Sequence, residues 1–134
     1  MIDNKKIYQS LKDYINAKSE YNPFVLRTAV DNKYPLVVFE DKSDLVDMQT
    51  QDRYRLNETR NANYEISIFA INVGETSSDE ICNELSQLVI DVMQRYYGMQ
   101  GGIDAKLKNI NTSKAMKVVL HFNCIYDARR NFIY

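Results

Sequence analysis

The sequence has no tryptophan, one histidine and two cysteines among its 134 residues. Cys82 and Cys124 are too few and too far apart for a disulfide framework or a zinc site, so we predict that both are reduced and packed in the core. A serine triad would have to be built on His121, and no nucleophile-elbow sequence accompanies it. These shortages argue against a disulfide-stabilised module and against a conventional hydrolase.

Long apolar runs are missing as well. No segment has the apolar length of a membrane helix, and the N-terminus lacks the apolar stretch of a signal peptide. We therefore expect synthesis and residence in a cytoplasm. The formal net charge is -1, so there is no overall basic field to hold a nucleic acid backbone. With 45% hydrophobic residues, residues 1–134 are predicted to form one globular domain.

Charged residues are nevertheless distributed unevenly. Acidic residues gather between Glu40 and Asp52 and between Glu75 and Glu84. Lysines form two further clusters: Lys5, Lys6, Lys12 and Lys18, and Lys106, Lys108, Lys114 and Lys117. Each cluster alone is typical of a solvated surface. Together they could align copies of the chain, positive to negative.

Two segments have helical periodicity. From Asp3, which can cap the helix, to Lys18, three apolar residues share one face: Ile7, Leu11 and Ile15. The tetrapeptide from Ser77 to Glu80 has the form of a capping box. An apolar stripe follows it and ends at Gly98: Ile81, Leu85, Leu88, Val89, Val92 and Tyr96. Because each helix has a single stripe, each is expected to pack against one face of a sheet.

Three segments are predicted to be strands: 35–40, 64–73 and 116–126. Alternation places two apolar sets on single faces: Tyr64, Ile66, Ile68 and Ala70, and Val118, Leu120, Phe122, Cys124 and Tyr126. Phe69, Ile71 and Val73 also make the second face of the middle strand apolar, so its end is expected to be covered on both sides. Shorter strands are predicted at 106–110 and 132–134, with a flexible turn at 99–102. The order predicts an α+β fold with a single mixed or antiparallel β-sheet and two helices packed on one face.

The segment from Asp41 to Asn63 is polar and contains neither glycine nor proline. A connection of this length without its own structure is uncommon in a compact domain, so we predict a protruding β-arm or hairpin that contacts partners. The partner-binding candidates are Met48, Arg53, Tyr54 and Arg55, because arginine and tyrosine dominate binding hot spots. The alternative is an exposed hairpin strand with Tyr54 on the core side and both arginines in water.

The sharpest catalytic alternative is Glu40-Asp41-Lys42, which follows an apolar strand, with Asp31 upstream. Metal-dependent nucleases of the PD-(D/E)XK type hold magnesium with such carboxylates, but the proline-aspartate element is absent. Asp41, Asp44, Asp47 and Asp52 lack the spacing and turn glycine of a calcium loop. His121 and Cys124 are an odd number of residues apart on a strand, hence on opposite faces. Residues 98–102 follow a helix and not a strand, so they are no phosphate loop. We expect no enzyme activity, metal or cofactor.

Three segments carry a resemblance to a known family: Tyr34-Pro-Leu-Val-Val-Phe-Glu40; Tyr64-Glu-Ile-Ser-Ile-Phe-Ala70, which precedes the capped helix; and Lys117-Val-Val-Leu-His-Phe-Asn-Cys-Ile-Tyr-Asp127 with the terminal Phe-Ile-Tyr. Their order and spacing resemble the tail terminator and tail-to-head joining proteins of long-tailed bacteriophages.

The resemblance implies a structural virion protein in the neck of the phage. It would form a homo-oligomeric, hexameric ring that ends polymerisation of the tail tube and joins the head connector. DNA would pass the lumen without specific binding. Two alternatives from the sequence stay open: another neck or head-completion component, or a small regulatory or enzymatic domain, because fold alone does not fix function.

Overall fold

The computed structural model describes residues 4–30, 33–42, 59–110, 115–127 and 132–133, with side chains described for 4–30, 33–42, 62–108 and 115–123. The elements follow in the order α1 (Asn4–Lys18), β1 (Phe24–Leu26), β2 (Leu36–Asp41), β3 (Thr59–Ala70), α3 (Ser78–Ile90), the π-helix η1 (Asp91–Tyr96), β4 (Gln100–Ile110), β5 (Ala115–Asp127) and β6 (Phe132–Ile133).

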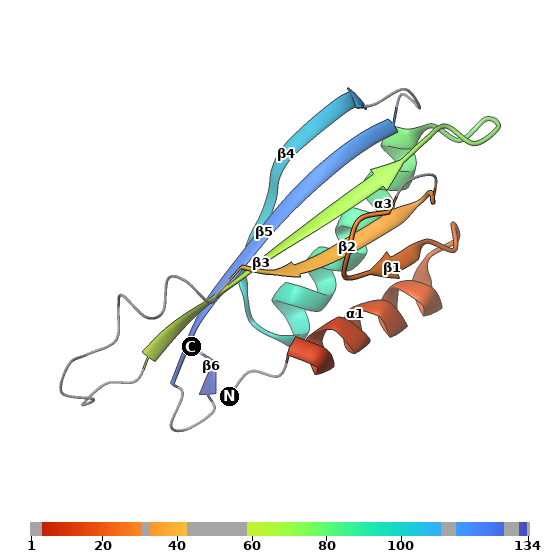
Figure 1. Ribbon diagram of the computed structural model, residues 1–134. Coiled ribbons are helices and arrows are strands. Elements are labelled where there is room, and N and C mark those ends of the chain that lie inside the picture. Colours follow the sequence, from red (N-terminus) through yellow and green to blue (C-terminus); the bar gives the residue numbers. More distant parts are fainter. Residues whose placement is uncertain (1–3, 31–32, 43–58, 111–114, 128–131, 134) are drawn as a thin grey trace.

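The strands form one mixed sheet in the order β1-β2-β3-β5-β4, and β6 pairs with the end of β5. β1 and β2 are parallel, whereas the other pairs are antiparallel. Both helices lie on the same side of this sheet (Figure 1). The predicted α+β class, with a mixed sheet and two helices on one face, is therefore confirmed.

The first helix begins and ends almost where its periodicity predicts. Ile7, Leu11 and Ile15 are all buried, and they are the residues of the predicted stripe. The hydroxyl of Tyr8 donates a 2.7 Å hydrogen bond to the carbonyl of Val25. This bond ties α1 to the edge strand β1, so the helix is fixed against the sheet by both apolar packing and a polar contact.

The second helix starts at the predicted cap, because the Ser77 hydroxyl accepts a 3.2 Å hydrogen bond from the backbone N–H of Glu80. Its last turn widens into the π-helix η1, and the chain then leaves through Gly98 at φ +62°, a left-handed conformation that favours glycine. The predicted stripe is correct except at Leu88, which is only partly buried, and at Tyr96, which is exposed. Cys82 is buried, as predicted, and desolvation raises the pKa of its thiol to about 11.

The structure corrects three boundaries in the sheet. The sequence predicts no strand at the position of β1. Three residues are too short to show alternation, and β1 forms only by pairing with β2. β4 starts at Gln100 and not at Lys106, so the predicted turn at 99–102 is wrong. Gly101 (φ +136°) permits this path, because a Cβ there would lie 2.0 Å from the carbonyl oxygen of His121. β3 ends at Ala70, and Val73 beyond it is exposed, so that end is not covered on both sides.

The predicted arm from Asp41 to Asn63 is only partly described. Asp41 belongs to β2, and Thr59 to Asn63 belong to β3, where they pair with the end of β5. β3 and β5 extend together beyond their neighbours in the sheet (Figure 1). The body of the arm, with Met48, Arg53, Tyr54 and Arg55, lies outside the described residues.

One hydrophobic core lies between the sheet and the two helices. β3 contributes Tyr64, Ile66 and Ile68, and each of these is at most 2% exposed. The helices contribute the stripes described above, and Leu85 in the middle of α3 is fully buried. The predicted core faces of β3 and β5 are confirmed wherever side chains are described.

Replacing Leu85 with alanine should lower the free energy of unfolding by about 2 to 5 kcal/mol, because the substitution leaves a cavity in a fully packed core. Leu88→Ala is the matched control on the same helix. Because Leu88 is only partly buried, this substitution should lower the free energy of unfolding clearly less. Urea denaturation of the two variants checks this. Equal losses would show that the assigned core is wrong.

Candidate functional site

The face of the sheet that points away from the helices is ordered in cross-strand rows, because register partners on neighbouring strands share a face. The first row runs across all five main strands: Phe24, Leu36, Phe69, Lys117 and Leu107. The second row is Leu26, Val38, Ser67, Val119 and Ala105. We call these two rows together the apolar half of the open face.

Burial within the apolar half falls towards its edges. Leu36 and Val38 in β2 are no more than 2% exposed, although they lie outside the main core. Phe24 on β1 and Leu107 on β4 are 44% and 46% exposed at the two edges. The exposed apolar side chains of this half therefore lie at the two edges of the sheet, with buried residues between them.

Two lysines lie over the two phenylalanine rings of this half. Lys33 Nζ is 5.2 Å from the ring centroid of Phe24, and Lys117 Nζ is 5.3 Å from that of Phe69. An ammonium at this distance interacts favourably with the ring face, and its aliphatic stem covers apolar surface. The apolar half is therefore also the basic end of the open face.

The next row along the strands is charged. Glu40, Glu65 and His121 are register partners on β2, β3 and β5. His121 lies between two carboxylates, with Nε2 2.8 Å from Glu65 Oε1 and Nδ1 3.3 Å from Asp104 Oδ2. Because both neighbours are acceptors, only the protonated imidazolium can donate to both at once. The second end of the open face thus carries three carboxylates.

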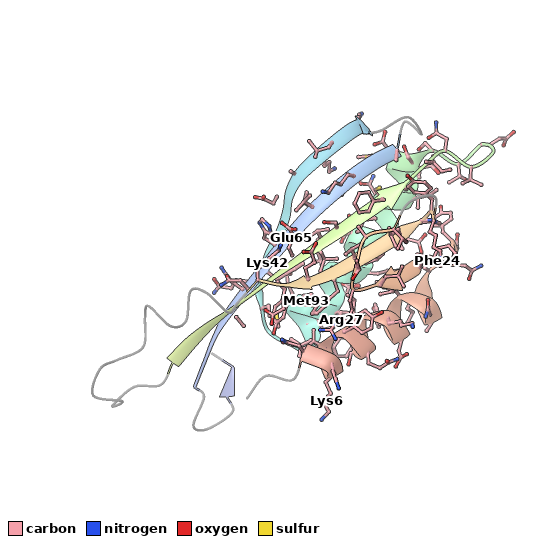
Figure 2. The ribbon with its side chains drawn as sticks, in the orientation of Figure 1. Lys6, Phe24, Arg27, Lys42, Glu65 and Met93 are labelled. Atoms are coloured by element: carbon pink, nitrogen blue, oxygen red, sulfur yellow. The ribbon has the colours of Figure 1, made fainter. Side chains whose placement is uncertain are left out.

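Lys42, two residues after Glu40, places a cation beside this charged row. Its Nζ lies 3.0 Å from Glu40 Oε2, and this hydrogen bond is the main reason why the pKa of Lys42 is raised, with Glu65 adding to the effect. Lys42 and Glu65 lie together on the sheet, far from Phe24 at the other end (Figure 2). The pair is well exposed, so it orients side chains more than it stabilises the fold.

Of the residues of the nuclease hypothesis, Glu40 and Lys42 lie together on the open face, and Asp41 is turned away from them. Glu40 lies on the open face, whereas the next residue, Asp41, lies on the helix side and accepts a hydrogen bond from the Asn4 side-chain amide. The same Asn4 accepts a 2.6 Å hydrogen bond from the Tyr64 hydroxyl. Asp41 therefore orients the first turn of α1, and Asp31 lies outside the described residues.

The other sequence candidates lie partly within and partly outside the described residues. His121 is exposed, as its position on the polar side of β5 predicts, and the side chain of Cys124 is not described. Asp44, Asp47 and Asp52 lie outside the described residues. Within the described residues, no group of three or more histidine, cysteine or acidic side chains is placed to hold a metal ion. None of the helices seen in those parts has the length and apolarity to cross a membrane.

The sequence alone does not predict the cross-strand rows of the open face. Phe24 and Leu107 drew no attention singly, since scattered exposed apolar residues are ordinary. Their combination follows from the register between strands that are distant in sequence, which no local pattern encodes.

No protein-family model matches the chain, and no curated protein matches it significantly.

We expect the purified protein to show no magnesium-dependent cleavage of DNA, because the sequence lacks the proline-aspartate element that would supply the second carboxylate of such a site. Incubation of supercoiled plasmid with the protein and Mg²⁺ checks this, with Glu40→Gln as the matched variant. Cleavage that is reproducible with homogeneous protein and lost in Glu40→Gln would contradict this prediction.

Proposed function

We propose that the protein is a ring-forming structural subunit of the tail terminator type, which ends the tail tube of a long-tailed bacteriophage and joins it to the head. The observation that supports this most is the open face, where apolar rows lie beside a charged row without covering helices. A virion subunit that acts by contact needs such a surface, whereas an enzyme needs a convergent polar site.

The polarity of the open face supports assembly by unlike ends. Its basic and apolar end carries Lys33 and Lys117, and its other end carries the carboxylates of Glu40, Glu65 and Asp104, which outnumber the Lys42 and His121 side chains paired with them. When the unlike ends of successive copies meet, the contact is heterologous, and such contacts close into rings if the rotation between copies closes. Charge complementarity also fixes the register of the contact.

The edges of the sheet add to this surface. β4 has 11 residues, and within the described part of the chain it pairs only with β5, so no described strand partners the backbone groups on its outer side. Exposed edge strands are templates for pairing with another chain. Leu107 and Ile103 are both exposed along it, one towards each face of the sheet, which favours contacts with the next copy or with the tail tube.

Tail assembly tests the function directly. Added to tails that are assembled without a terminator, the protein should stop tube growth at a uniform length and allow the tails to join heads. Electron microscopy measures both outcomes. Tails of uncontrolled length in the presence of folded protein would contradict the proposal.

A substitution at the open face tests the surface. Leu107→Glu places a charge in the first apolar row and should shift the protein from rings to monomers in analytical ultracentrifugation without changing its circular dichroism. Val73→Glu is the matched control, because Val73 is 57% exposed but lies beyond the end of β3. An unchanged ring with Leu107→Glu, or equal loss with both variants, would place the contact elsewhere.

A further inference from the structure

A second surface lies on the helix side of the molecule, in the cleft between α1 and η1. The cleft has a volume of about 580 Å³, within the usual range of ligand pockets. It is lined by Ser10, Asp13, Tyr14, Val92, Tyr96 and Tyr97. Three of the ten tyrosines of the chain therefore meet at one site.

The π-helix explains how two adjacent tyrosines reach the same cleft. In η1 a turn closes over five residues instead of four, so Tyr96 and Tyr97, four and five positions after Val92, both come back to its side. In a regular α-helix the second of them would be rotated away. Such widened turns are frequent at functional sites.

The aromatic walls are held in place. The rings of Tyr14 and Tyr96 meet edge to face, with centroids 5.8 Å apart and planes at 65°. The Tyr97 hydroxyl donates a 2.8 Å hydrogen bond to the Ser10 hydroxyl and so links the end of η1 to α1. Tyr96 is 63% exposed and presents its ring to solvent at the mouth of the cleft.

Carboxylates accompany these rings. Asp13 lines the cleft and is oriented by a 2.8 Å hydrogen bond from the Gln9 side-chain amide. Burial raises the pKa of the Tyr14 phenol, and the charge of the neighbouring Asp91 and a hydrogen bond to it raise this pKa further. Arg95 is close enough to lower the pKa of Tyr14, but it does not line the cleft.

We propose that this cleft binds an arginine side chain carried by another polypeptide, stacked on the tyrosine rings and paired with Asp13. Faces of aromatic rings attract cations, and arginine is the commoner partner because its flat guanidinium also stacks. The site is separate from the open face of the sheet, so the inference does not depend on ring formation.

The shape of the cleft favours a side chain over a free small molecule. Ser10, Asp13 and Tyr96 are all exposed, so the cleft is open to solvent along its length. Pockets for small ligands bury most of the ligand surface, which an open cleft cannot do alone. An arginine inserted from a protein surface is covered by its own chain on the outer side.

Titration followed by nuclear magnetic resonance tests the proposal on the full chain. The probe is the pentapeptide Gly-Gly-Arg-Gly-Gly with blocked ends, and the matched probe has citrulline in place of arginine, which keeps the shape but removes the charge. The ring signals of Tyr14, Tyr96 and Tyr97 should shift in a saturable manner with the arginine peptide and little with the citrulline peptide.

Two variants should weaken binding of the arginine peptide without unfolding the protein. Tyr96→Leu removes one exposed ring and should weaken it about two- to fivefold, the size of an exposed cation–π contact. Asp13→Asn should weaken it and make it less sensitive to salt. The matched control, Glu75→Gln, changes an exposed carboxylate in the turn between β3 and α3, outside both surfaces, and should leave binding unchanged.

Three outcomes would overturn the proposal. Equal binding of the citrulline peptide would show that charge is not recognised. Unchanged binding in both cleft variants would place the peptide elsewhere. Binding of choline as tight as that of the arginine peptide would assign the cleft to a free quaternary ammonium compound and not to a polypeptide.

Discussion

The antiparallel pairing of β3 with β5 is the constraint on which the other features depend. Twelve register pairs run without a shift from Thr59 opposite Asp127 to Ala70 opposite Met116. Because side chains alternate, this register places Tyr64 and Phe122 towards the helices and Glu65 and His121 towards the open face. A slip of one residue would exchange the two faces and bury charge. The core and the polar rows of the open face are thus two results of one backbone arrangement.

The second constraint is the unequal covering of the sheet. The apolar stripes of α1 and α3 suffice for one face only, and the other face keeps Leu36 and Val38 buried while Phe24 and Leu107 stay exposed. An α+β domain of this size could have placed polar residues there. Apolar rows that end in a charged row favour contact with a partner, and this is the physical basis of the assembly role that we propose.

Much of the fold could be predicted from local sequence. The spacing of Ile7, Leu11 and Ile15, and the Ser77 cap, encode their helices locally, and alternation encodes β3 and β5. β1 and the start of β4 could not be predicted, because both depend on pairing with strands distant in sequence. For the same reason, the cross-strand rows of the open face could not be predicted. Tyr96 was predicted to lie on the apolar stripe of its helix, because the widened turn of η1 has no sequence signal as clear as a cap or a glycine.

We propose that the open face is the assembly surface. Lysine acetylation of the free and the tail-bound protein, read by mass spectrometry, tests it most directly. Lys117 and Lys42 lie on the open face, whereas the exposed Lys18 lies at the end of α1 on the helix side. The account predicts that assembly protects Lys117 and Lys42 and leaves Lys18 reactive. Protection of Lys18 with unchanged labelling of Lys117 and Lys42 would contradict it.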